Sequence, residues 1–510
     1  MNNQPSIINI INFIRGVEPR EPVDLYEPVR QQLALLEEYQ MRGTFLLQYD
    51  ALIDSNFTNM LKNTPHEIGC WVEIVEPLCS AAGIPWRGRF PWDWHSHVGF
   101  SVGYPPHERE KLMDIYMQKF HEIFNQYPKS AGSWMIDAHT LNYLSQKYGV
   151  IASCNCKDQW GTDGYTLWGG YYGQAYYPSK TNAYAPSQTQ ENQIPIPVFK
   201  MLGSDPIYQY DAGLSLEEGA AKWQNVITLE PVYVKGGGGG NPEWTKWFFD
   251  NIMTASCCIA FRYAQVGQEN SFGWPAMSKG LRDQFKHLQR MQEQNALRVE
   301  PLAETAAWYK SQYPITPNAA ITALVDWKNE GRKSIWFCSR RYRTNLYCEG
   351  SRIWFRDIML YDDKYQERYM NAVCDNPEMA YDNLPIIDGN RWSGNNIRAG
   401  IYFKSGEKDL AVTGVDVKEE NEDLIVSIAA ENGVVTVRFS SDAIDVSTDI
   451  SGLSLEFVYG VSNEMDSAVV SEKTFTLMHE GFEYSMRLPK GSMANKTIIP
   501  ENGCISMNFY

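Results

Sequence analysis

The chain has 510 residues, of which 44% are hydrophobic and 21% are charged, and its formal net charge is −16. This length exceeds one ordinary hydrophobic core, so we expect two or three domains. The acidic balance excludes nucleic acid as a partner, because binding a polyanion depends on clustered Lys and Arg. No run of eighteen apolar residues is present, which excludes a membrane-spanning helix and a membrane protein.

The N-terminal segment and the cysteines indicate the cellular location of the protein. Residues Asn2 to Ile14 have no basic start and no small-residue cleavage site, and they predict a first strand rather than a signal peptide. The ten cysteines show no spaced framework of the kind that small secreted domains use, so they are expected to be reduced. A cytoplasmic location follows, or a periplasmic or secreted one if a leader has been removed.

From Ile7 to about Tyr313, short apolar runs alternate with stretches that have helical periodicity. The expected strands are 7–17, 43–49, 67–75, 132–137, 150–156, 194–201, 226–234 and 257–264. The clearest amphipathic helices are 25–39 and 108–124. This alternation predicts an α/β fold, with seven or eight βα units that form a barrel or an open parallel sheet.

After Pro314 the pattern changes to strands rich in Trp, Tyr, Val and Ile, separated by Asp-Gly, Asn-Gly and Ser-Gly turns. We therefore expect a barrel domain over residues 1–315 and a β-sandwich-like region over residues 316–510. A subdivision near residue 400 is possible, because the segment before 397–406 is aromatic and basic while the one after it is acidic.

Two long connections, 84–107 and 161–193, exceed the usual βα loop length and predict lids or binding walls. The first holds Trp92, Trp94, His95 and His97, a composition suited to stacking on sugar rings and bonding sugar hydroxyls. The two histidines, with Asp137 and His139, also offer ligands for zinc. Since no further spacing fixes such a site, we expect no metal, with His139 orienting a carboxylate or buried in the core.

Five carboxylates follow predicted strands, where the carboxyl ends of a parallel barrel surround the active site. They are Glu18, Glu73, Asp137, Asp158 and Glu269. Cleavage of a glycosidic bond needs two carboxyl groups, one protonated and one ionised. Alternatively, each of the five caps a helix or pairs with an arginine such as Arg15 or Arg20.

Among these acids, Glu73 is the candidate general acid, because the neighbouring Trp71 provides an apolar wall that raises a carboxyl pKa. Asp137, with a donor such as His139 nearby, is the candidate nucleophile or base. Trp71, Trp160, Gln265 and Asn270 are expected to contact substrate, together with the Trp and His residues of the 84–107 connection.

A sequence phrase points to a family. Gly43-Thr44-Phe45-Leu46-Leu47, followed by Thr64-Pro65-His66-Glu67-Ile68-Gly69-Cys70-Trp71, resembles the polysaccharide deacetylases, in which two later histidines hold a divalent metal. Trp71 and Val75 stand at those two positions, and the family's first-strand Asp-Asp pair is also missing. The resemblance implies a distorted (β/α) barrel with a carbohydrate cleft, without the deacetylase metal.

The chain also looks like a relative of glycosidases of family 57, which use paired carboxylates on a similar barrel. We therefore expect a hydrolase that cleaves glycosidic bonds in an oligosaccharide or polysaccharide without a cofactor. Two alternatives stay open: a metal-dependent carbohydrate esterase or deacetylase with relocated ligands, and a catalytically silent glycan-binding protein. The oligomeric state is not predicted.

Overall fold

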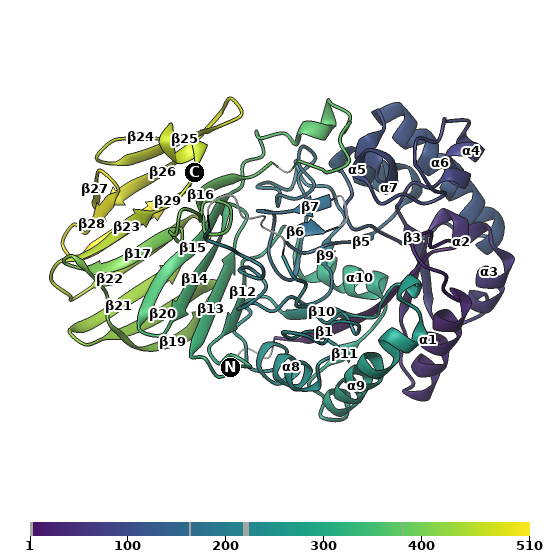
Figure 1. The fold of residues 1–510 in the computed structure, drawn as a ribbon, viewed down its shortest axis with the longest axis horizontal. Helices are drawn as coiled ribbons and strands as arrows, with labels where there is room; N and C mark the ends of the chain where they lie inside the picture. The colour runs from purple at the N-terminus through teal and green to yellow at the C-terminus, as the bar shows by residue number, and fades with distance from the viewer. Residues whose placement is uncertain (1–3, 163–164, 218–223, 381, 510) are drawn as a thin grey trace.

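The computed structural model describes residues 4–162, 165–217, 224–380 and 382–509 (Figure 1). An α/β barrel built from the N-terminal part of the chain lies beside a β-sandwich built from the C-terminal part. Within the described ranges, no helix has both the length and the apolar character needed to cross a membrane.

The barrel sheet contains seven parallel strands in the order β10-β1-β2-β3-β4-β5-β9, with β8 added antiparallel to β9. Their bounds are β1 Ser6–Ile14, β2 Thr44–Leu47, β3 Glu67–Trp71, β4 Ser130–Gly132, β5 Ala152–Asn155, β8 Ala175–Tyr176, β9 Val198–Lys200 and β10 Arg262–Val266. Short β11 (Arg298–Val299) pairs with β1. The predicted class, a distorted (β/α) barrel, is confirmed.

Helices pack around this sheet, and one contacts strands from two parts of it. The helices around the sheet are α1 Tyr26–Glu38, α2 Tyr49–Ile53, α3 Ser55–Leu61, α4 Glu76–Ala82, α5 Ser96–Gly99, η1 Ser101–Gly103, α6 Pro106–Phe124, α7 Ala138–Tyr148, α8 Pro242–Trp247, η2 Phe248–Ile252, η3 Asn270–Phe272 and α9 Trp274–Glu293. Helix α10 (Leu302–Gln312) contacts both β1 and β5, and its first residues donate to Thr44 and Glu67, which begin β2 and β3.

Two predicted strands differ from the structure. The strand expected at 132–137 ends at Gly132, because Asp137 instead begins α7. The segment 226–234 forms no strand in the described part of the chain and contributes only one isolated bridge, Ser204 with Thr228. Pro231 lies in its middle, and a proline removes a donor from any strand ladder.

The C-terminal region consists of two antiparallel sheets packed face to face. One contains β12 Ala319–Ala323, β13 Arg332–Cys338, β14 Tyr342–Glu349, β15 Arg352–Leu360, β16 Leu384–Asp388, β17 Gly400–Ser405, β18 Lys408–Asp409, β23 Leu453–Val458, β27 Ser492–Ala494 and β28 Thr497–Ile499. The other contains β19 Val412–Glu420, β20 Asp423–Ala430, β21 Gly433–Phe439, β22 Ala443–Thr448, β24 Val469–Val470, β25 Thr474–His479, β26 Phe482–Lys490 and β29 Cys504–Asn508. The predicted β-sandwich-like region is confirmed.

One hydrophobic core fills the sandwich. Phe337 and Phe355 from the first sheet and Val437 and Phe439 from the second belong to the same buried cluster. Strand β17 lies inside the segment where a subdivision is possible, and it pairs with β15 and β23. The domain boundary near residue 315 stays a prediction, which limited proteolysis can test.

The remaining short elements lie in connections: β6 Gln159–Thr162 pairs with β7 Tyr165–Leu167, and η4 Arg368–Met370 and α11 Asn463–Asp466 belong to the C-terminal region. Buried polar contacts join the two bodies. Arg343 of β14 forms an ion pair with Asp158 beyond β5, and Trp168 donates from Nε1 to Asp388 Oδ2 at 2.9 Å. Because unpaired buried charges are costly, these contacts fix the sandwich against the barrel.

Candidate active site

A buried charge cluster lies at the carboxyl ends of four barrel strands. Arg15 follows β1, Gln48 follows β2, Glu73 follows β3 and Glu269 follows β10. The Arg15 guanidinium donates to Glu73 Oε1 and to Glu269 Oε1, each at 3.2 Å, and Gln48 donates to Glu73 Oε2 at 2.6 Å. None of the four side chains is more than 5% exposed. We call this set, with Asp50, the Arg15 cluster.

The backbone around Arg15 is held from two sides. Asn270 accepts from the Arg15 N–H at 2.9 Å and donates to the Arg15 carbonyl at 2.9 Å. The next residue is Gly16, where a Cβ would lie 2.8 Å from the Asp50 carbonyl carbon, so only glycine fits without a shift. The Gly16 N–H donates to Asp50 Oδ1 at 3.0 Å. These contacts position Arg15 and Asp50 together.

Two acids of the cluster, Asp50 and Glu73, hold protons more tightly than usual. Burial raises the pKa of Asp50 to about 7, although the N–H groups of Gly16 and Ala51 and the Arg15 charge lower it. Asp50 is half-buried as a residue, but its Oδ2 is enclosed and has no hydrogen-bond partner among the described residues. Burial also raises the pKa of Glu73, against the opposing Arg15 charge. One guanidinium faces three carboxyls, so the cluster retains a proton near neutral pH.

Two of the carboxylates are close to each other. Glu73 Oε1 and Glu269 Oε2 each lie 3.2 Å from the same Arg15 nitrogen. The two oxygens are therefore no more than about 6.4 Å apart. This limit is compatible with the spacing of roughly 5–5.5 Å between the carboxylates of retaining glycosidases.

The connection 84–107 covers the cluster. Trp92 is 1% exposed, and the Arg15 guanidinium lies over its ring at 3.8 Å. Arg20 lies over the rings of Trp92 and Trp94 and forms a bidentate bond to Glu18. Trp92 thus presents its face to a cation in this conformation. The loop has the placement of a lid, and its role in sugar binding stays a prediction.

Below the cluster, aromatic side chains form its floor. Trp71 is completely buried, with its ring 4.3 Å from Phe13 and 5.5 Å from Trp134 between centroids. Gln265 is also buried and donates to the Tyr263 hydroxyl. These contacts favour core roles for Trp71 and Gln265. The side chain of Trp160 lies outside the described part of the chain.

Asp137 occupies a separate environment at the start of α7. Its carboxylate accepts from the Thr140 N–H and hydroxyl, from Ser101 and from Arg109, and it is fully buried. Burial by itself raises its pKa, but the Arg109 charge and these donors outweigh burial and lower it. The contacts are those of a helix cap in a buried ion pair, so we leave Asp137 out of the proposed catalytic set.

The residues of the predicted metal alternative form no group with metal-ligand spacing in the described part of the chain. His95 contacts Asp93 at 2.6 Å and its ring lies 6.1 Å from that of His97, while His139 contacts Glu110 at 3.0 Å on the surface of α7. Trp71 and Val75 have no lone pair for a cation, and Arg15 brings a positive charge to the cluster. The residues at the barrel mouth therefore do not fit a deacetylase metal.

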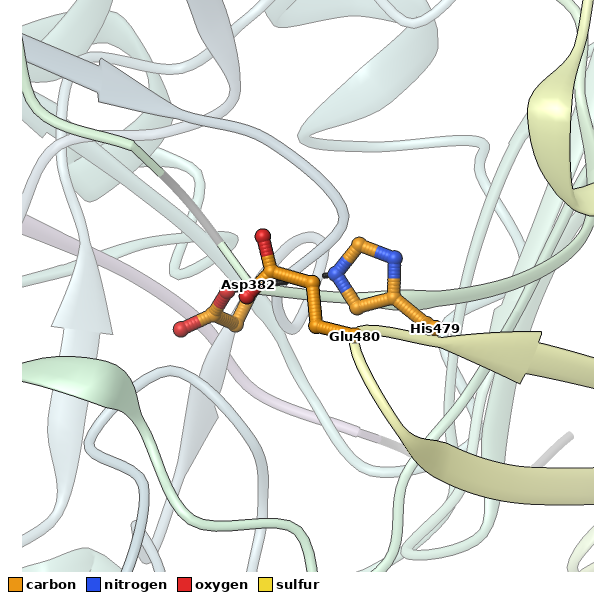
Figure 2. Close-up of side chains that lie close together, drawn as sticks. All are labelled: Asp382, His479 and Glu480. Carbon is orange, nitrogen blue, oxygen red and sulfur yellow. Dashed lines mark ion pairs between the residues drawn. The ribbon is translucent and has the colours of Figure 1, made fainter.

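In the described residues, one group of side chains has metal-ligand spacing, and it lies on the sandwich (Figure 2): Asp382, His479 and Glu480. Arg368 already forms ion pairs with Asp382 and Glu480. Burial lowers the pKa of His479, but the carboxylates of Asp382, at 3.9 Å, and Glu464, at 3.3 Å, outweigh it and raise the pKa to about 9. With the imidazole protonated, these side chains and Arg368 form an ion-pair network.

Sequence reasoning placed Glu73 and Glu269 at strand ends and named Arg15 as a possible partner, but it missed Gln48 and Asp50. These two residues also follow strands, so the rule that selected the five acids would have found them if it had included every polar side chain. The alternative role expected for these acids, pairing with an arginine, is seen at three of them. Glu18 pairs with Arg20, while Glu73 and Glu269 pair with Arg15.

Solved structures share this fold, whereas no protein-family model and no curated protein matches the chain. A "putative glycoside hydrolase/deacetylase" from Parabacteroides distasonis is 15% identical, covers 77% of this chain and 91% of its own, and has a TM-score of 0.52. A "putative polysaccharide deacetylase" from Mycobacterium smegmatis is 12% identical over 61% of this chain and 92% of its own, with a TM-score of 0.38. The first likeness shows that the chain has the deacetylase-type barrel fold, as the sequence phrase implies.

Proposed function

We propose that this protein is a carbohydrate-active hydrolase that removes an acyl group from a sugar, with the Arg15 cluster as a metal-free acid–base site. The observation that carries the proposal is Asp50, a carboxyl group with a pKa of about 7 and an enclosed oxygen, beside a fixed guanidinium. The deacetylase-type fold supports the choice of an acyl group on a sugar as substrate.

The chemistry follows from these groups. A general base is most effective when its pKa lies near the working pH, and Asp50 meets that condition for taking a proton from water. The Arg15 guanidinium supplies positive charge for the oxyanion that forms when water adds to the acyl carbon. Glu73 and Glu269 hold the guanidinium in place, and Gln48 holds Glu73.

Access to the site requires motion of its cover. Because Trp92 lies directly over Arg15, a sugar reaches Asp50 only when the connection 84–107 moves away. Several active-site loops open and close in this way during turnover. The opening of the connection 84–107 is thus part of the proposed function.

A second candidate function is cleavage of a glycosidic bond. It is favoured by one observation, the close approach of Glu73 and Glu269 to one Arg15 nitrogen. In that case Glu73, whose pKa is raised, is the acid and Glu269 is the nucleophile or base.

Product analysis separates the two functions. Protein treated with EDTA is incubated with 4-nitrophenyl acetate, acetylated xylan and chitooligosaccharides, and in parallel with a panel of 4-nitrophenyl glycosides. We expect released acetate and no new reducing ends, and unchanged rates after adding zinc. New reducing ends would support the glycosidase. Glycan binding without turnover, or activity that requires zinc, would contradict the proposal.

A further inference from the structure

A small cavity lies between the barrel and the sandwich, at the carboxyl ends of β5 and β9. Its volume is about 30 Å³. Lys157, Asp158, Lys200 and Ser204 line its polar side, and Ile321 of β12 contributes from the sandwich. The Arg15 cluster does not include these side chains, so the cavity is a separate feature. We call it the lysine cavity.

The two lysines are nearly inaccessible to bulk water. Lys157 is 3% exposed and donates to Gln209 Oε1 at 3.2 Å, and Lys200 is 6% exposed and donates to the Cys156 carbonyl at 2.7 Å. An ammonium group carries three N–H donors. Each lysine therefore retains N–H donors that have no acceptor among the described residues.

None of the nearby acids accepts a hydrogen bond from either lysine in the described part of the chain. Asp158 Oδ2 forms an ion pair with Arg343, while its Oδ1 has no partner among the described residues. Arg343 also binds Asp357 with both carboxylate oxygens. Glu230 lies near Lys157, but burial raises its pKa to about 7, so it is only partly ionised at neutral pH. Asp205 also lies near Lys157, but its oxygens accept from Ile207, Tyr208 and Trp244.

The pKa values of both lysines are lowered by this environment. Burial lowers the pKa of Lys157 and that of Lys200 to about 8 each, against the nearby acids that raise them. A buried cation is stabilised by an anion that accepts its hydrogen bonds. The cavity thus has N–H donors available for an anion.

The size of the cavity limits that anion. One water needs about 10–15 Å³ of such volume, so the cavity holds the equivalent of two or three waters. A phosphorylated sugar is far too large. A one- or two-carbon carboxylate has three or four heavy atoms and matches this space.

We propose that the lysine cavity binds a small monocarboxylate of formate or acetate size, with Lys157 and Lys200 donating to its oxygens. The inference rests on the proposed function in one respect only: acetate is the product that removal of an acetyl group would release. Binding itself depends on the cavity and its lysines.

Calorimetric titration with sodium acetate, with sodium chloride at equal ionic strength as the reference, tests the proposal. We expect saturable one-site binding of acetate and formate at pH 7, a rise of a few degrees in Tm at saturation, and no binding of butyrate. Lys200→Met should weaken acetate binding about tenfold or more, since a charged hydrogen bond contributes roughly 1.5–3 kcal/mol. Lys180→Met, which removes an exposed lysine bonded to the Glu191 carbonyl, is the matched control and should bind as wild type.

Two further measurements keep the test decisive. Carbon-13 acetate line broadening on the wild-type protein needs no variant, so a Lys200→Met protein that fails to fold does not leave the question open. Absence of broadening and of saturable heat would show that the cavity holds water only, which overturns the proposal. Asp50→Asn should lower the rate of acyl hydrolysis by about 10²- to 10⁴-fold and still bind acetate, so the failure of the proposed function and the failure of this inference are distinguishable.

Discussion

Glu73 and Asp137 follow adjacent strands of the barrel and are equally buried, yet their pKa values move in opposite directions. Asp137 accepts hydrogen bonds from Ser101, Thr140 and its own ion-pair partner Arg109. Glu73 shares its arginine with Glu269. Burial alone therefore does not set the charge of a carboxyl group. The hydrogen-bond donors and cations around each acid decide whether it holds a proton, as Glu73 does, or stays ionised and caps a helix, as Asp137 does.

The largest expected effect concerns catalysis by the Arg15 cluster. Asp50→Asn should lower the rate of acyl hydrolysis by about 10²- to 10⁴-fold, because the amide cannot take a proton from water. The measurement is acetate release from a responsive acetylated sugar. Asp114→Asn, at a surface pair with Lys147, is the control and should retain full activity. Full activity in Asp50→Asn would remove the basis of the proposed mechanism.

The next effect concerns stability at the Asp137 region. Arg109→Met leaves a buried carboxylate without its cation, and we expect a loss of about 3–5 kcal/mol in the free energy of unfolding. Urea denaturation measures it. Lys147→Met breaks an exposed pair with Asp114 and should cost far less. If the two variants lose equal stability, Asp137 is not the structural group described above.

A pH experiment tests whether the Arg15 cluster holds a proton on Asp50, in contrast to the ionised Asp137. The folded-state pKa of Asp50 is about 7, above its ordinary value of 3.8, so the folded protein binds the extra proton between these values. Stability therefore falls as pH rises through this window, by up to about 1.4 kcal/mol per pH unit from this group. Asp50→Asn should flatten that part of the profile. A parallel profile in wild type and variant would contradict the raised pKa.

The smallest effect concerns the sandwich network in Figure 2. The pKa of His479 is raised to about 9 from 6.5, so its contribution to stability is complete below pH 6.5 and is lost as pH rises through 9. Because the side chain is partly exposed, His479→Gln should cost only about 1 kcal/mol at pH 6 and almost nothing at pH 10. A Tm increase on adding zinc at pH 7 would instead indicate a metal site.

Much of the fold could be predicted from the chain itself. The period-two and helical patterns located most strands of the barrel, and the turn-rich texture after Pro314 predicted the sandwich. The strand predicted over 226–234 was wrong. This apolar run has the composition of a strand, but Pro231 lacks the N–H group that strand pairing needs. Local composition cannot show whether a run finds a neighbouring strand.

The barrel class, the absence of metal ligands at Trp71 and Val75, and the placement of Glu73 and Glu269 at strand ends follow from the order of the amino acids. The meeting of particular charges depends on how the strands pair in the folded chain. Arg15 and Glu269 are 254 residues apart, and they come together because β1 and β10 pair in the closed sheet. A carboxyl pKa depends on burial and on donors within a few ångströms. Those neighbours exist only after folding, so the proton-holding Arg15 cluster and the lysine cavity could not be identified from the sequence.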